Sequence, residues 1–466
     1  MVLNRVTTRC RAPSGRTAAR WPHRPTRPSR TPHPATHHQE TPMLPTVSHG
    51  AGVHVYDTEG REYLDGCSGA INTNLGHGLP EITSRMHHQL DAIAFAYRTQ
   101  FTSEPLERLS ALLTELAPGT LGNPVYGNSG SEAIEAALRL TTLFHSEAHR
   151  PFKCTVLTEE PSYHGMTAGA LGASGHPARR HGLTPLLANQ ATVAKVRPRQ
   201  GDMRADVEQW ERAIEEVQPQ NLAAVIVEPV GGASSGAVPC DPAVLRRLRE
   251  LADEHGFLLI ADEVMTGLGR TGTWFGCDHA GIVPDVLVLG KGVTAGYAPL
   301  SAVLVRDEIA AAFDRPLGSV VFGHTMAGAP LAAAAGLATV EYLKEHDVPA
   351  LAARSGRHLR TLLEGLVDRH PVVRDVRGRG LQLALGLHAA PGRSPGTAHD
   401  LVLAAREHGL LLYPAGVNAL TESVLVAPPL NSTEAELEEL AVRLDHSLTA
   451  LTPAPAAQAD ELVAAH

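Results

Sequence analysis

Lysine is scarce in this chain of 466 residues, which contains only Lys153, Lys195, Lys291 and Lys344. Aromatic residues make up only 4% of the chain, and its five cysteines are scattered and include no C-x-x-C pair. This pattern argues against a disulfide framework and a cysteine-based zinc site, and it favours the reducing cytoplasm. The 25 histidines form no H-E-x-x-H motif, so no metal site is expected.

Basic charge is also scarce outside one short segment. Residues 1–42 hold eight of the 40 basic residues and one of the 49 acidic residues. The remainder therefore carries 32 basic and 48 acidic residues, a net charge of −16. A folded body this acidic is a poor surface for nucleic acid, so no nucleic-acid partner is expected.

Residues 1–42 have few apolar residues and consist largely of Arg, Pro, Thr and His. Five prolines between positions 22 and 34 prevent a continuous helix, and no apolar core of a secretory signal is present. The composition predicts a disordered extension. An organellar transit peptide, or a wrongly chosen start with Met43 as the true one, remains open. Residues 451–466, rich in Ala and Pro, are expected to fray.

One uncharged stretch, residues 319–340, is long enough to span a bilayer. It is rich in Ala and Gly, however, and includes His324, Thr325 and Pro330. The stretch is therefore expected to form a loop followed by a buried helix, and no membrane partner is expected.

Short apolar runs alternate with amphipathic segments from Val53 onward. The runs that predict strands are Cys154–Leu157, Ala223–Val230, Phe257–Val264, Asp285–Leu289 and Gly380–Leu387. The segments that predict helices include Ser131–Thr142, Ala205–Val217, Pro242–His255 and Glu434–Leu448. This alternation indicates an α/β fold with a mostly parallel sheet covered by helices. We expect a large domain at residues 71–331 and a smaller α/β domain formed by residues 43–70 and 332–450.

Lys291 is the lysine best placed for chemistry. It follows the apolar run Asp285–Leu289 and lies between Gly290 and Gly292, which allow a bulky group to approach the backbone. Partial burial at the end of a strand lowers the pKa of a lysine and frees its amine for Schiff-base chemistry. A lysine in a surface turn is the other interpretation.

Two further apolar runs end in acids, Asp262 with Glu263, and Glu228. A carboxylate at the end of a core strand is costly unless it is paired. A protonated pyridine nitrogen is one possible partner; backbone amides or Arg270 are the alternatives. Glu228, Asp262 and Lys291 would converge if their strands are neighbours.

The segment Gly127-Asn-Ser-Gly-Ser-Glu132 opens an amphipathic helix. Amide groups at a helix start bind phosphate, and Gly130 allows close approach. The same letters also form an ordinary capping box, so this segment decides nothing alone. Gly267-Leu-Gly-Arg-Thr-Gly272 matches a dinucleotide-binding pattern, but no helix follows it, which argues against NAD or FAD.

Eight short motifs occur together in order. They are Asn128–Ala133, Ser162–Gly165, Val227–Val230, Ala261–Gly267, Gly269–Gly272, Leu289–Gly292, Gly323–Thr325 and Val376–Gly380. With this order and spacing the chain resembles the class III aminotransferases of the ornithine and ω-amino acid type, which have PLP (pyridoxal 5′-phosphate) fold type I. The resemblance covers about residues 53–448 and is closest to the ω-amine branch.

The resemblance implies a role for each matched position. Lys291 would hold the cofactor as a Schiff base and move the proton, and Asp262 would keep the pyridine nitrogen protonated. Tyr163 would stack on one face of the ring and Val264 would pack on the other. The remaining implied cofactor contacts are Gly130 and Ser131 at the phosphate, Glu228 near the ring, and Thr325 reaching the phosphate from the neighbouring subunit of a homodimer.

The activity implied is ping-pong transfer of an amino group from an amine or ω-amino donor to a 2-oxo acid. Aminomutases, racemases and decarboxylases on this fold use the same lysine and aspartate, and they remain the alternative. The arginine that grips a substrate carboxylate in the ornithine branch is replaced by Leu425, and none lies near Leu420. Another residue such as Arg98 or Arg379 could replace it, or the donor is an amine without a carboxylate.

Overall fold

The computed structural model describes residues 44–187, 193–313, 324–388 and 396–451. The extension predicted for residues 1–42 and the tail from residue 452 lie outside these ranges, as does Gly323. Residues 1–45 and 46–466 separate into two units, and every described helix and strand belongs to the second.

Most of the sequence motifs lie at or near the strands of one seven-stranded sheet. Its strand order is β4-β10-β9-β8-β7-β5-β6. Its strands are β4 (Leu121–Gly127), β5 (Thr155–Glu159), β6 (Val193–Val196), β7 (Leu222–Val227), β8 (Leu258–Asp262), β9 (Val286–Leu289) and β10 (Ser301–Arg306). From β9 to β6 all neighbours pair in parallel, whereas β10 runs antiparallel to both β4 and β9. The predicted α/β fold with a mostly parallel sheet is confirmed.

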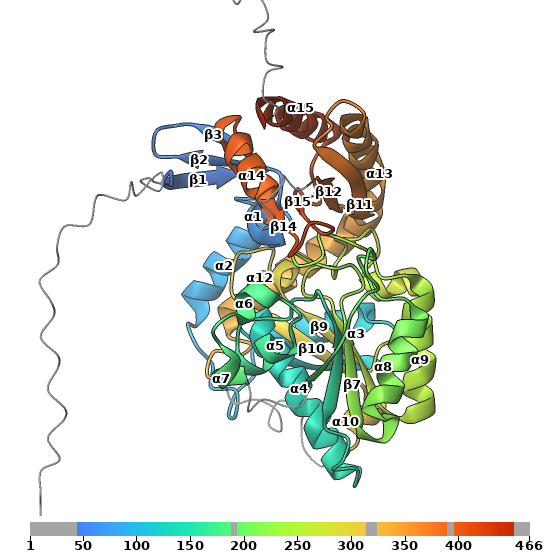
Figure 1. Cartoon of the computed structure of the whole chain (residues 1–466). Helices are drawn as coiled ribbons and strands as arrows, with labels where there is room; N and C mark the ends of the chain where they lie inside the picture. The colour runs from blue at the N-terminus through green and yellow to red at the C-terminus, as the bar shows by residue number, and fades with distance from the viewer. Residues whose placement is uncertain (1–43, 188–192, 314–323, 389–395, 452–466) are drawn as a thin grey trace, which may run out of the picture. The chain divides into compact units, whose positions relative to one another are not determined.

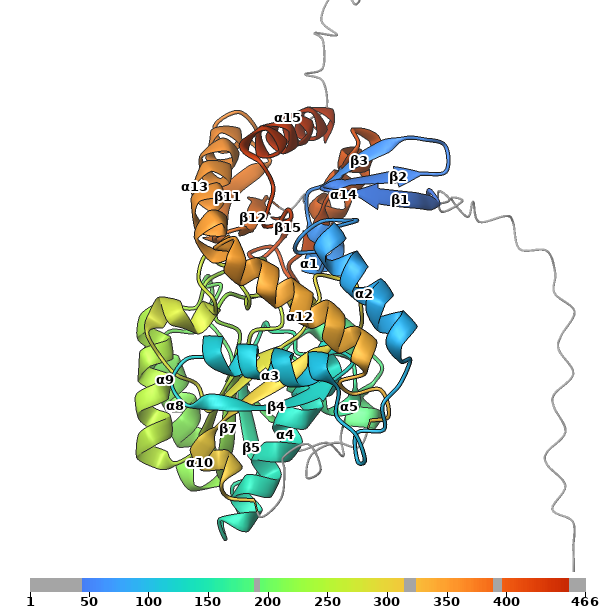
Figure 2. The same ribbon diagram turned by 180° about the vertical axis from the view of Figure 1, so that it is seen from behind.

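Helices cover both faces of this sheet, because successive strand residues point to opposite sides. In β8, Leu258 and Ile260 face one apolar core, and Leu259 and Ala261 face the other. The first core is covered by α4 (Gly130–Glu147), α5 (Ala168–Ala173) and α10 (Asp307–Ala310). The second is covered by α2 (Pro80–Ala92), α3 (Glu104–Leu116), α8 (Val207–Val217), α9 (Pro242–His255) and α12 (Pro330–Glu345). Figures 1 and 2 show these two layers from opposite sides.

Local sequence sets the ends of the covering helices. The α8 helix starts in a capping box, in which Asp206 accepts from the backbone N–H of Gln209 and the Gln209 side chain accepts from that of Asp206. Its buried residues, Trp210 and Ile214, lie four positions apart on one face. The α9 helix ends at Gly256 in the left-handed conformation (φ 65°), which glycine adopts most easily.

Two smaller sheets combine both ends of the chain. One has the order β1-β2-β3-β13, with β1 (Val47–Ala51), β2 (His54–Asp57), β3 (Glu62–Asp65) and β13 (Leu410–Leu411). β2 and β3 form an antiparallel hairpin around residues 58–60, and β13 pairs in parallel with β3, Leu410 lying opposite Leu64.

The other sheet has the order β11-β12-β15-β14, with β11 (Val373–Arg379), β12 (Gln382–Leu387), β15 (Ser423–Val426) and β14 (Tyr413–Ala415). Helices α13 (Val348–Val367), α14 (Thr397–Glu407) and α15 (Glu434–Leu451) pack with these sheets. The division into domains at residues 70 and 331 stays a prediction. Across the second boundary, α12 packs against both α2 and α3, as Figure 2 shows.

The remaining described helices are short: α1 (Ser68–Ile71), α6 (Pro177–Arg180) and α7 (Thr184–Leu187), with 3₁₀ turns at Pro219–Asn221, Gly276–Ala280 and Lys291–Val293. The helix predicted after residue 319 is α12, which is largely buried. Among the described residues, no helix has both the length and the apolar character needed to cross a membrane.

Candidate active site

Three neighbouring strands of the central sheet end at one cavity. Glu228 directly follows β7, Asp262 is the last residue of β8, and Lys291 follows β9 by two positions. All three line a cavity of about 160 Å³. The convergence expected from the sequence therefore occurs, at the carboxyl edge where ligands of parallel sheets bind.

Lys291 is held in an unusual backbone conformation at this edge. Its φ of 37° lies in the left-handed region, which costs a non-glycine residue free energy and is concentrated at functional sites. Burial lowers the pKa of its amine to about 8, although Asp262 and Glu228 oppose the shift. About a tenth of the amine is therefore unprotonated and nucleophilic at pH 7, far more than for an ordinary lysine.

Asp262 is buried, and a histidine holds it in place. Nδ1 of His164 lies 2.7 Å from Oδ2 of Asp262, and the backbone N–H of Val264 donates to Oδ1 at 3.1 Å. A carboxylate only accepts, so Nδ1 carries the proton. Nε2 of His164 is then free to accept from the hydroxyl of Thr158, 3.1 Å away. The motif Ser162–Gly165 thus contributes a second functional side chain that the sequence did not reveal.

Glu228 holds the backbone beside the cavity. Its carboxylate accepts from the backbone N–H of Tyr163 at 3.2 Å and of Gly232 at 2.9 Å. Burial raises the pKa of Glu228 above its ordinary value, and His164 and the bond from Gly232 oppose this shift. Tyr163 is half-buried and also lines the cavity. Glu228 therefore positions Tyr163 through the main chain.

The start of α4 forms the opposite wall. Gly130 and Ser131 both line the cavity, and Ser129 caps the helix by accepting from the backbone N–H of Glu132. A Cβ added at Gly130 would lie 3.0 Å from a side-chain carbon of Val264, so a larger residue there would require Val264 to shift. The α4 helix has 18 residues, and its positive end favours an anion at this wall.

The lining of this cavity has the parts that pyridoxal phosphate needs: an amine, a buried carboxylate, an aromatic ring and an anion-binding helix start. Aminotransferase class III is the family whose model matches the chain, over residues 35–448. The chain belongs to the class III aminotransferases. Its cofactor is pyridoxal 5′-phosphate, and its reaction is the transfer of an amino group.

Three proteins, two of them with solved structures, illustrate what this aminotransferase is similar to. An uncharacterised aminotransferase of Bacillus subtilis, YodT, is 36% identical over 412 residues, which are 85% of this chain and 93% of that protein. A transaminase from a marine Virgibacillus superimposes with a TM-score of 0.82 at 29% identity, covering 88% of this chain and 94% of that one. An amine transaminase from an uncultivated Pseudomonas, solved in its PLP-bound form, gives 0.81 at 30% identity, covering 90% and 98%.

Three of the residues considered from the sequence do not line the cavity of this aminotransferase. Thr325 is exposed and lies before α12. Arg98 belongs to the segment between α2 and α3, and Arg379 ends β11, so neither candidate for the carboxylate site borders the cavity.

Of the alternative partners considered for Asp262, one backbone amide, that of Val264, does bind it. The other candidates belong elsewhere. Backbone amides of Gly276 and Cys277 donate to Glu263, which also accepts from Thr266. Arg270 is fully buried and donates to Ser68, Asn74 and the carbonyl oxygens of Leu381 and Pro428. Neither arrangement involves Asp262.

Proposed function

We propose that this aminotransferase moves an amino group from an amine or ω-amino donor to a 2-oxo acid in two half-reactions of ping-pong type. The observation that carries the proposal is the meeting of Lys291, Asp262 and the start of α4 in one cavity. When bound, the cofactor supplies the electron sink that lets an amine lose its α-proton.

The chain's own groups would divide the remaining work. Lys291 would hold the cofactor covalently and carry the proton between the reacting carbons, which suits an amine with a pKa near 8. Asp262 would keep the ring nitrogen protonated, and Gly130 and Ser131 would bind the phosphate. Tyr163 and Val264 would cover the two faces of the ring and exclude water.

Apolar side chains beside the cavity support a donor with an apolar substituent. Met265 lines the cavity and packs on a buried cluster made of Ile71, Ala237, Ala384, Ala415, Leu425 and Ala427. Leu425 occupies the place where the ornithine branch carries its arginine, and here it is completely buried among apolar neighbours. A guanidinium there would lack a partner, so this wall suits hydrocarbon.

The test is a panel of amines mixed with the PLP form while the pyridoxamine spectrum is followed. We expect accepted amines to convert the cofactor, and a 2-oxo acid to restore it with release of a new amino acid. Conversion that leaves the amino group within the donor molecule, or release of carbon dioxide, would instead support the aminomutase or decarboxylase alternative.

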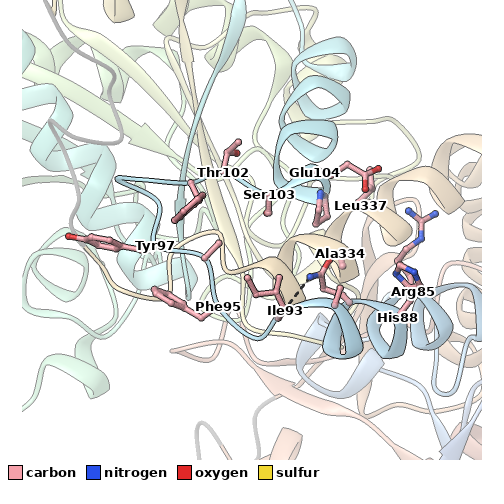
Figure 3. A pocket seen from close by; sticks show the side chains of 15 residues that line it. Arg85, His88, Ile93, Phe95, Tyr97, Thr102, Ser103, Glu104, Ala334 and Leu337 are labelled. Atoms are coloured by element: carbon pink, nitrogen blue, oxygen red, sulfur yellow. Dashed lines mark hydrogen bonds between the residues drawn. The ribbon is translucent and has the colours of Figure 1, made fainter.

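We further propose a homodimer formed through the face that carries α2, α3 and α12. A groove of about 570 Å³ lies there, lined by residues of all three helices and by the aromatic side chains of Phe95, Tyr97 and Phe101 in the segment between α2 and α3. Figure 3 shows Ile93 near Ala334, with Phe95 and Tyr97 farther along the same groove. Exposed apolar clusters of this kind mark protein interfaces.

The position of Thr325 supports the same face. It is exposed, it precedes α12, and the nearby Gly328 packs against Leu106 of α3. From there Thr325 of one subunit would reach the cofactor phosphate of the other. The four described cysteines are free thiols, which supports a reducing, cytoplasmic location.

Phe101→Asp tests the dimer, because the Phe101 side chain is 66% exposed at this groove. We expect light scattering to give a monomer with lost activity. Phe152→Asp, at a residue 78% exposed after α4, is the matched control and should stay dimeric. A dimeric Phe101→Asp variant with full activity would refute the proposed face.

A further inference from the structure

An arginine lies against the aromatic wall of the active site. The guanidinium carbon of Arg179, in the short helix α6, is 4.6 Å from the centre of the Tyr163 ring. His176 meets the same ring edge-on at 6.3 Å. Tyr163 lines the cavity together with Lys291, and we call the segment 176–180, which contacts the Tyr163 ring, the rim on this side.

Among the described residues, no carboxylate accepts a hydrogen bond from the Arg179 side chain. Its contacts are the Tyr163 ring and the sulfur of Met166, 3.8 Å from Nη1. A thioether is a weak acceptor, and Arg179 is half-buried rather than free in solvent. Its neighbour Arg180 differs, because it donates to the carbonyl oxygens of Leu171, Gly172 and Ser174.

Stacking on an aromatic ring leaves the edge of a guanidinium available. That planar edge carries paired N–H donors in the geometry that matches a carboxylate. Burial lowers the pKa of His176, and Arg179 adds to this effect, so the imidazole is neutral at pH 7. Arg179 is therefore the cation of this rim. Its charge also contributes to the lowered pKa of Lys291, which places it within electrostatic range of the reacting amine.

The other arginines near this region are already engaged. Arg270 donates to carbonyl and side-chain oxygens in the core. Arg377 is buried and donates to Asp375, Gly236 and Thr421. The usual carboxylate position is Leu425, inside an apolar cluster.

We propose that Arg179 binds the carboxylate of the 2-oxo acid acceptor and thereby determines which acceptors this aminotransferase uses. The inference rests on the proposed function. The carboxylate would lie at the Tyr163 rim, whereas a donor amine without a carboxylate would use the apolar wall around Met265. One active site could then accept chemically different partners in its two half-reactions.

The test compares Arg179→Met with the holoenzyme of the parent, and with Arg197→Met as a matched control. The Arg197 side chain is 75% exposed and pairs with Glu160, and neither residue lines the cavity. The pyridoxamine form of each protein is mixed with pyruvate, with 2-oxoglutarate and with butanal, an acceptor that has no carboxylate. For Arg179→Met we expect kcat/KM to fall roughly 10- to 100-fold for both oxo acids and to stay within about threefold for butanal. Arg179→Lys keeps the positive charge but loses the paired planar N–H donors, so its kcat/KM for the oxo acids should lie between those of the parent and Arg179→Met.

A binding measurement makes the test independent of turnover. Calorimetry with the PLP holoenzyme should show that Arg179→Met weakens binding of glutarate about tenfold or more, while glutaramide binds both proteins equally. If the parent turned over no amine, the proposed function would fail, yet this measurement would still report on Arg179. Equal losses of kcat/KM for butanal and for the oxo acids would overturn the proposal. A variant that lost only PLP affinity would overturn it too, and would make Arg179 a phosphate ligand. Unchanged discrimination in a folded variant would overturn it as well.

Discussion

Replacing Asp262 by Asn removes the charge of this side chain and little else. Asn fills nearly the same space and can still accept from the backbone N–H of Val264. Its amide group would then face Nδ1 of His164, so the imidazole must shift its proton to Nε2 and donate to Thr158 instead. Because this network can adapt, we expect the variant to fold and to bind PLP.

The expected cost falls on proton abstraction from the donor. A carboxylate beside the ring nitrogen stabilises its protonated form by direct charge pairing, and an amide cannot. In a buried site the loss of such a charge is worth about 4 kcal/mol of transition-state stabilisation, or roughly a thousandfold in rate. We therefore expect a half-reaction about a thousandfold slower, with cofactor affinity changed far less.

Single-turnover kinetics with an accepted amine measures this step, with cofactor affinity followed separately by absorbance. Glu263→Gln is the matched control, since Glu263 is also buried and adjacent in sequence but binds Gly276, Cys277 and Thr266. In Glu263→Gln, one of the groups that now donate to the carboxylate would face the amide nitrogen instead. We expect this to lower the free energy of unfolding by about 1–3 kcal/mol, without a comparable decrease in the rate of the half-reaction. A half-reaction of Asp262→Asn within threefold of the parent would refute the assignment and turn attention to Glu228 or Glu263.

Three other outcomes are expected. Lys291→Ala should fold but lose turnover and the covalently bound cofactor, as borohydride reduction and peptide mapping can establish. Lys195 is the strongest competitor, because burial lowers its pKa to about 7. Cofactor found on Lys195 would contradict the role of Lys291. Capture of PLP by the cofactor-free protein should accelerate between pH 6.5 and 9 with a midpoint near 8, because deprotonation of Lys291 creates the nucleophile; a flat stopped-flow profile would argue against this. Deletion of residues 1–42 should leave the melting temperature and activity unchanged, since a segment so poor in apolar residues cannot offset its ordering entropy; a melting temperature lower by several degrees would show otherwise.

The central part of the fold could be predicted because its strands are buried on both faces. Such strands appear in the sequence as short continuous apolar runs. A charged residue ends β8 and follows β7 and β9 within two positions, all at the same edge. The first strand, β4, could not be recognised this way, because Leu121–Gly127 includes Asn123 and Pro124. Its place in the sheet depends on β10, more than 170 residues later in the chain.

The side chains that orient the site were harder to predict. His164 lies inside the motif Ser162–Gly165, but the sequence does not indicate its partner. Only the folded structure brings it to Asp262, which is 98 positions later in the chain. Arg179 and Arg180 are adjacent and cannot be distinguished in the sequence. The structure shows that Arg180 donates to carbonyl oxygens, whereas Arg179 faces the Tyr163 ring. Contacts of this kind depend on how loops pack, and periodicity carries no information about that.

The pairing of β3 with β13 imposes an order on synthesis of the chain. The hairpin of β2 and β3 can close as soon as it leaves the ribosome, but Leu64 finds its partner Leu410 only after 346 further positions. At 5–20 residues per second that interval is roughly 20–70 s. Throughout it the outer edge of β3 is unpaired and able to bind other strands, including those of nascent chains nearby. Slow translation or a stalled ribosome would lengthen this exposure, so the yield of active enzyme should depend on how quickly the segment between β3 and β13 is made.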